Sequence, residues 1–173
     1  MRKLVEAQQD ELWKQRTFAV FDSDALAPGY PSKPSEDLRK SCTAALVPHH
    51  RLFRRNAESY LPVPALEAWA KKLPVAQREK QLRKVRAFAK LRADQRHHFN
   101  LKAGFDGDRV RLDREKGSLL FAHLHQPAYE LLRAGFGREI ANIFNEANPS
   151  LWFSNDDQDT EMTALFKSLL ERA

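Results

Sequence analysis

The sequence predicts an α/β fold, in which a small parallel sheet is followed by a mainly α-helical C-terminal region. Residues 17–21 are apolar and β-prone, and they lead directly into Asp22, Ser23 and Asp24. A second β-prone run covers residues 47–53, and a helix is expected between the two runs over residues 36–45. Two strands joined by a helix most simply form a parallel pair with a right-handed crossover.

The other elements follow from apolar spacing and from the positions of proline and glycine. A helix is expected over residues 2–16. Residues 25–35 contain three prolines and are expected to form an exposed loop, with Ser35 capping the crossover helix. After the second strand we expect a polar helical turn that ends before Pro62, then helices over residues 65–72, 74–98, 127–134, 137–148 and 160–171.

These elements divide the chain into three parts. We expect an α/β unit over residues 1–64, a basic helical segment with a lysine-containing loop over 65–105, and a helical region over 106–173. With 173 residues and 42% hydrophobic content, the chain can bury a core. It has neither a run of about 18 apolar residues nor an apolar signal segment, so we expect a cytoplasmic protein without membrane contact. The single cysteine, Cys42, is expected to be a small buried residue of the crossover helix.

The positive charge of the chain is concentrated in one segment. The net charge is +6, and residues 78–96 hold eight basic residues against two acidic ones. An exposed basic helix fits DNA or RNA, because cations bind the phosphate backbone whatever its sequence. The residues predicted to make this contact are Arg78, Lys80, Arg83, Lys84, Arg86, Lys90, Arg92 and Arg96.

Asp22 and Asp24 are candidate metal ligands. Side chains two positions apart on a strand point to the same side, so both carboxylates could meet one Mg²⁺ or Mn²⁺ ion. The alternative is that they only cap the turn that follows the strand. The histidines predict no zinc site, because neighbours such as His49 and His50 face opposite sides of a strand and no helical His-Glu-x-x-His motif is present.

The residues after the second strand extend this pattern. Arg54 and Arg55 are followed by Glu58 and by Tyr60-Leu61-Pro62, and Lys102 lies in a later Lys-Ala-Gly-Phe stretch. Together with the Asp-x-Asp pair, this order resembles the C-terminal half of a TOPRIM domain of the OLD (overcoming lysogenization defect) nuclease type, over about residues 17–105. That family also carries an earlier strand with a Glu-Gly turn. Glu6 stands in a similar context but is followed by Ala7, and we interpret it as a solvated helix residue.

The resemblance implies a partial TOPRIM-like domain that cleaves nucleic acid in anti-phage defence. It implies that Asp22, Asp24 and Glu58 bind Mg²⁺ or Mn²⁺, that Lys102 joins them in catalysis, and that Arg54 and Arg55 contact nucleic acid. The chain lacks a phosphate-binding P-loop, so an ATPase subunit is an implied partner. A second chain that supplies the missing carboxylate is another.

Two other functions stay open. The chain could be a catalytically inactive TOPRIM-like module that binds nucleic acid or protein, or its basic helix could pair with an acidic protein surface. For Glu58 the alternative to metal binding is an ion pair with Arg54, one helical turn earlier. For Lys102 the alternative is a solvated position in a loop.

Overall fold

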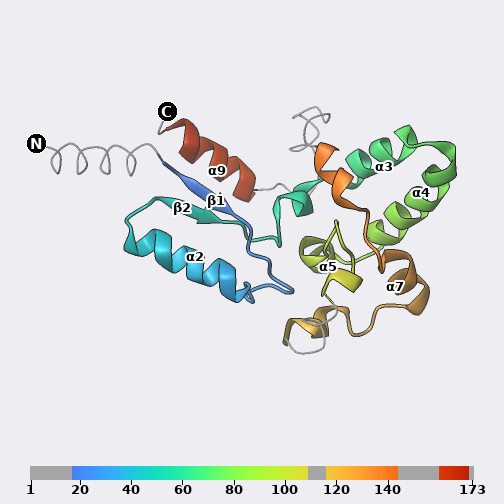
Figure 1. The fold of residues 1–173 in the computed structure, drawn as a ribbon, viewed down its shortest axis with the longest axis horizontal. Helices are drawn as coiled ribbons and strands as arrows, with labels where there is room; N and C mark the ends of the chain where they lie inside the picture. The colour runs from blue at the N-terminus through green and yellow to red at the C-terminus, as the bar shows by residue number, and fades with distance from the viewer. Residues whose placement is uncertain (1–16, 109–115, 144–159, 172–173) are drawn as a thin grey trace, which may run out of the picture.

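The computed structural model describes residues 17–108, 116–143 and 160–171 (Figure 1). Strand β1 (Ala19–Phe21) pairs in parallel with β2 (His49–Arg51), and Ala19 lies opposite His49. Helix α2 (Lys33–Ala44) connects the two strands. The predicted βαβ unit is therefore present, in a mostly helical molecule whose described part contains this two-stranded sheet. The helix expected over residues 2–16 lies outside the described residues.

Helix α2 begins earlier than its sequence suggests. Ser32 is the N-cap, and its Oγ accepts a hydrogen bond from the backbone N–H of Ser35 at 3.2 Å. The prediction that Ser35 caps the helix is wrong, because Pro34 is tolerated in the first turn, where a backbone N–H has no helical partner. Ser35 instead donates its hydroxyl to the backbone oxygen of Asp22 at 2.9 Å, which ties α2 to the end of β1. Cys42 is buried in this helix, as expected.

The predicted long basic helix is two helices. After η1 (Ala57–Tyr60) and α3 (Val63–Lys72), the chain forms α4 (Val75–Ala89) and then α5 (Ala93–His98). Between these two helices Leu91 is buried in the core, with 4% of its surface exposed. Arg92 then takes an extended conformation, and its backbone N–H donates to Oε1 of Gln95 at 3.1 Å, which starts the second helix.

The main core lies among the helices. It includes Phe105, just before η2 (Asp106–Asp108), and continues into η3 (Lys116–Phe121), α7 (Gln126–Leu132) and η4 (Arg138–Asn142). Aromatic rings hold its centre: the ring of Phe105 stacks on Tyr129 at 4.8 Å and meets Phe99 edge-on at 5.1 Å. Full burial of such a side chain contributes about 1.5–3 kcal/mol. The α7 and η4 segments match the expected helices at 127–134 and 137–148, the second as a shorter 3₁₀ helix over its described residues.

The last helix, α9 (Thr160–Leu170), returns to the sheet. Figure 1 shows α2 on one side of the two strands and α9 on the other. Leu165 of α9 packs with Leu52 and Tyr60 in a second, smaller core cluster. Packing therefore does not follow the three parts expected along the sequence, because the C-terminal helix covers the N-terminal unit and the main core runs from Leu61 to Ile143. None of the described helices is long and apolar enough to cross a membrane.

Candidate functional site

The Asp-x-Asp segment forms a turn. β1 ends at Phe21, and Asp24 has a left-handed φ of 48°. The strand alternation from which Asp22 and Asp24 were predicted to share a side is therefore absent, because the strand ends before Asp22 and a left-handed turn stands at Asp24. Ser23, buried between them, donates its hydroxyl to the backbone oxygen of Arg54 at 2.6 Å. The turn after β1 is thus joined to the segment that follows β2, where the other site residues begin.

Asp22 is partly buried between these two segments. Its Oδ1 accepts a hydrogen bond from the backbone N–H of Ala57, the first residue of η1, at 3.1 Å. Burial raises the pKa of the Asp22 carboxyl, and the negative charges of Glu58 and Asp24 raise it further. The ammonium group of Lys102 acts in the opposite direction on this pKa. All four predicted catalytic residues are therefore close enough to interact electrostatically.

Glu58 lies in η1 and is almost fully buried, with 6% of its surface exposed. The 3₁₀ turn is started by Asn56, whose Oδ1 accepts hydrogen bonds from the N–H and the hydroxyl of Ser59. Oε1 of Glu58 lies 2.6 Å from Nζ of Lys102, whereas the buried Oε2 has no hydrogen-bond partner. A buried carboxylate oxygen without a partner costs about 1–3 kcal/mol or more, so its presence calls for an explanation.

The ion-pair partner of Glu58 is Lys102. Arg54, the alternative considered from the sequence, places its guanidinium over the ring of Tyr60 at 4.5 Å. Lys102 is 40% exposed at its side chain and comes from the loop after α5. Two features fix this loop. Leu101 is fully buried, and the backbone oxygen of Lys102 accepts a hydrogen bond from the N–H of Gly137 at 2.9 Å. The loop therefore presents the ammonium group to the two strand ends.

A divalent cation fits this arrangement in part. Oε2 of Glu58 has no partner, and Asp22, whose pKa is raised by burial and then by the charges of Glu58 and Asp24, lies beside it, so a cation would be accommodated by these carboxylates. However, within residues 17–108, 116–143 and 160–171 no group of three or more His, Cys, Asp or Glu side chains is placed to hold a metal ion. Mg²⁺ commonly uses only one or two protein carboxylates and takes its other ligands from water and substrate phosphates. Asp22 and Glu58 suit that kind of site, with the exposed Asp24 beside them.

The residues predicted to bind nucleic acid divide into exposed and buried ones. Arg78, Lys80, Arg83, Arg86, Lys90 and Arg92 are exposed, and Arg54 and Arg96 are half-buried. The prediction is wrong for Lys84, because its Nζ is turned inward and donates to the backbone oxygen of Gly135. Burial lowers the pKa of this lysine. It is also wrong for Arg55, which is 4% exposed and makes two hydrogen bonds to Asp108 at 2.5 and 2.6 Å.

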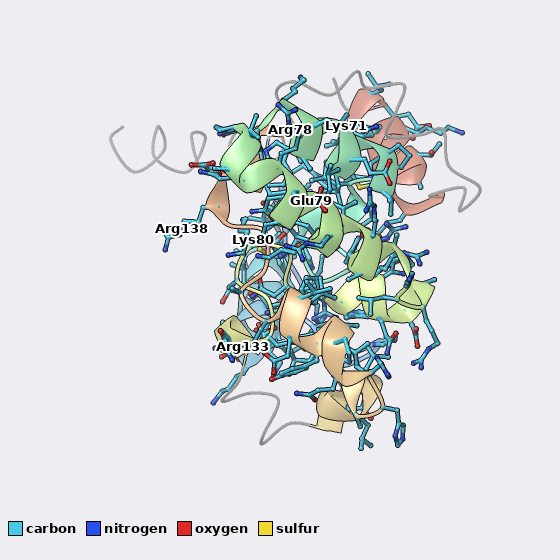
Figure 2. All side chains as sticks on the ribbon, turned by 90° about the vertical axis from the view of Figure 1, so that its right-hand side faces the viewer. Lys71, Arg78, Glu79, Lys80, Arg133 and Arg138 are labelled. Atoms are coloured by element: carbon cyan, nitrogen blue, oxygen red, sulfur yellow. The ribbon has the colours of Figure 1, made fainter. Side chains whose placement is uncertain are left out.

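The exposed cations do not all come from the predicted run. In Figure 2, Arg78 and Lys80 of α4 can be seen together with three cations from other elements, Lys71, Arg133 and Arg138. Lys71 lies in the last turn of α3, Arg133 follows α7, and Arg138 begins η4. Sequence reasoning missed these three because single cations far apart in the chain carry no local signal.

Glu161 was also missed. This buried residue of α9 accepts a hydrogen bond from Nε2 of His50 at 2.7 Å and one from the backbone N–H of Phe53 at 2.8 Å. It also accepts the hydroxyl of Tyr60. Burial, followed by this hydrogen bond, raises the pKa of Tyr60. Glu161 thus contacts residues from β2 to the end of η1, and η1 carries Glu58.

Comparisons of the chain with protein-family models, with curated proteins and with solved structures find no match.

Proposed function

We propose that the chain is a metal-dependent nuclease of the TOPRIM-like kind that hydrolyses phosphodiester bonds in DNA or RNA. The observation that carries the proposal is the pairing of Glu58 with Lys102 beside Asp22: a buried carboxylate with one oxygen unpartnered, next to a carboxyl whose pKa is raised. These groups come from three separate segments that meet just beyond the C-terminal ends of two parallel strands. Such strand ends are where open α/β sheets place their functional groups. The resemblance in sequence points to the same residues.

Each residue has a role in this proposal. Asp22 and Glu58, with Asp24 beside them, would hold Mg²⁺ or Mn²⁺, which lowers the pKa of a bound water and offsets charge on the leaving oxygen. Lys102, exposed on one side, is placed to stabilise negative charge that develops on the phosphate. The Ala57 N–H keeps Asp22 oriented through its hydrogen bond to Oδ1. The exposed cations of α4 would bind the phosphate backbone in a salt-dependent manner.

The second candidate is a catalytically inactive TOPRIM-like module that binds nucleic acid or protein. It is favoured by the finding that the described residues offer no group of three side chains for a metal ion. A basic α4 surface that pairs with an acidic protein is the third. The resemblance alone adds to the proposal a role in anti-phage defence, an ATPase partner and a second chain that completes the site. The proposed cytoplasmic location rests instead on the sequence, which has no run of about 18 apolar residues.

The test is cleavage of labelled single- and double-stranded DNA and RNA by the purified chain, with Mg²⁺ or Mn²⁺ and with a chelator. We expect Asp22→Asn and Glu58→Gln to lower the cleavage rate by at least about 100-fold. Asp37→Asn is the matched control, because Asp37 is an exposed carboxylate of α2 outside the site. Undiminished cleavage by Asp22→Asn would contradict the proposal. Binding of nucleic acid without any cleavage would support the inactive module.

A further inference from the structure

A pocket of about 830 Å³ runs along β2, next to the carboxylate site but separate from it. Six consecutive residues, from His49 to Arg54, line one wall. The proline-containing loop after β1 and the end of α5, with His97 and His98, line the others. Ser23 also lines it, and Ser23 stands between Asp22 and Asp24. Neither Asp22 nor Asp24 lines the pocket, so Ser23 is the point at which the pocket adjoins the carboxylate site.

The lining of this pocket is cationic. Three arginines, Arg39, Arg51 and Arg54, line it and carry its positive charge. The four histidines of the lining are not counted in this charge, and burial lowers the pKa of one of them, His98. Arg39 and Arg51 both pair with Glu36, each at 2.6 Å, so two guanidinium groups share one carboxylate and leave an excess positive charge. The acidic lining residue Glu161 is already engaged by three hydrogen-bond donors. A pocket of this charge suits an anionic ligand.

An exposed aromatic ring stands at the same pocket. Phe53 lines it, although 72% of its surface is exposed. The ring lies 5.6 Å from the imidazole of His50, at an angle of 53°. Cationic grooves beside exposed aromatic rings are the common means of binding single-stranded nucleic acid, because phosphates meet the cations and unpaired bases stack on the rings. In a duplex the base faces are already stacked and cannot make this contact.

We propose that the pocket binds single-stranded nucleic acid, with phosphates beside Arg39 and Arg51 and a base stacked on Phe53. This inference rests on the proposed function and specifies its substrate class. A strand held along β2 would pass Ser23 and so reach Asp22 and Asp24. The arginines orient the strand and the ring selects unpaired bases.

The test is fluorescence anisotropy with labelled single-stranded DNA, single-stranded RNA and duplex DNA of about 12 nucleotides or base pairs, in chelator without metal. We expect single strands to bind more tightly than the duplex. Phe53→Ala should weaken single-strand binding about 10-fold, whereas Phe53→Tyr should retain it. Leu119→Ala is the matched control, because Leu119 is 75% exposed in η3 and does not line the pocket. Glu36→Gln removes the carboxylate shared by the two arginines and should strengthen binding.

A variant of α4 separates the pocket from the basic surface. Lys80→Gln with Arg83→Gln removes two exposed cations and should weaken duplex binding, while the effect of Phe53→Ala on single strands persists. Equal affinity for duplex and single strand, wild-type affinity in Phe53→Ala, or loss of all single-strand binding in the α4 variant would overturn the inference. Because no metal is present, these results do not depend on cleavage. Metal-dependent cleavage with unaltered binding by Phe53→Ala would leave the proposed function standing and remove only this inference.

Discussion

Oε1 of Glu161 lies 2.7 Å from Nε2 of His50, so the last helix closes on a strand residue 111 positions earlier in the chain. The same carboxylate accepts the N–H of Phe53 and the hydroxyl of Tyr60, and only 8% of Glu161 is exposed. These three donors all come from the stretch that begins with β2 and ends with η1. One buried carboxylate thus fixes both α9 and the segment that carries Glu58.

Replacing Glu161 should therefore destabilise the protein and loosen Glu58. We expect Glu161→Ala to lower the free energy of unfolding by about 2–4 kcal/mol, because the buried Tyr60 hydroxyl and two part-buried donors lose their acceptor at once. Glu161→Gln keeps an oxygen acceptor and should cost less. Urea denaturation measures both, with Glu171→Ala as the control, since Glu171 is exposed just after α9. An equal, small effect of Glu161→Ala and Glu171→Ala would show that α9 does not depend on this contact.

The pKa of Asp22 leads to a prediction about pH and stability. Burial and the charges of Glu58 and Asp24 raise this pKa, so the folded protein holds the proton more tightly than the unfolded chain does. The stabilisation that this gives is present below the ordinary Asp pKa of about 3.9 and is lost as the pH rises through the higher pKa of the folded state. Asp22→Asn avoids that loss and still offers an oxygen to the Ala57 N–H.

We therefore expect Asp22→Asn to be more stable than the wild type at pH 7 and to lose this advantage as the pH falls below about 4. Urea denaturation at several pH values measures the difference. Asp37→Asn, at an exposed position, should show no such pH dependence. Under the proposed function, added Mg²⁺ should stabilise the wild type and have little effect on Asp22→Asn. A variant that is less stable at pH 7 and more stable at pH 4 would reverse the sign and contradict the burial argument.

The sequence predicted the elements whose signals are local. The two strands and α2 follow from β-prone runs and a helical interval, and these are confirmed. The break between α4 and α5 was not predicted, because the helical apolar pattern continues through Leu91 and no glycine or proline interrupts residues 75–98. The burial of Lys84 was missed because its partner is the backbone of Gly135, 51 residues away.

The residues of the candidate site also divide into those that the sequence marks and those that only tertiary packing reveals. Asp22 was singled out by its place after the first strand, and Glu58 and Lys102 by the family resemblance; the structure brings the three together. The structure does not extend strand alternation to Asp24, because a left-handed turn begins there. Glu161 carries no sequence signal, because it follows an Asp-rich stretch of the sequence and nothing local distinguishes its glutamate from a solvated one. A contact between residues more than 100 positions apart, such as that of Glu161 with His50, can be identified only once the packing of the last helix is known.

Breaking the buried ion pair of Arg55 and Asp108 should lower the stability of the protein far more than breaking an exposed ion pair. Both side chains are about 5% exposed and make two hydrogen bonds. Removing one partner leaves a buried charge, so we expect Asp108→Asn and Arg55→Met each to lower stability by about 3–5 kcal/mol. Arg92 and Asp94 are the matched pair, with side chains 63% and 40% exposed. Asp94→Asn should cost less than about 1 kcal/mol. Thermal denaturation compares the variants, and equal costs in the two pairs would contradict the effect of burial.

The last prediction concerns the backbone contact that positions the Lys102 loop. Gly104 has a φ of 64° and Gly135 a φ of 59°, and the two backbones approach so closely that a Cβ on either would overlap the other. Gly137 also has a positive φ, 95°, but a Cβ there would meet no atom within 4 Å. Gly137→Ala should therefore cost only the conformational penalty of about 1–2 kcal/mol.

Gly104→Ala adds a steric clash with backbone to that penalty, so we expect a clearly larger loss of stability, about 3 kcal/mol or more. The clash should also displace the loop and with it the ammonium group that pairs with Glu58. Urea denaturation of the two alanine variants gives the stability difference, and the cleavage assay at a temperature where both stay folded gives the effect on activity. Under the proposed function Gly104→Ala should lower the cleavage rate while Gly137→Ala does not. If both variants lose the same stability, the left-handed conformation accounts for the whole effect and the close approach of the two loops contributes nothing.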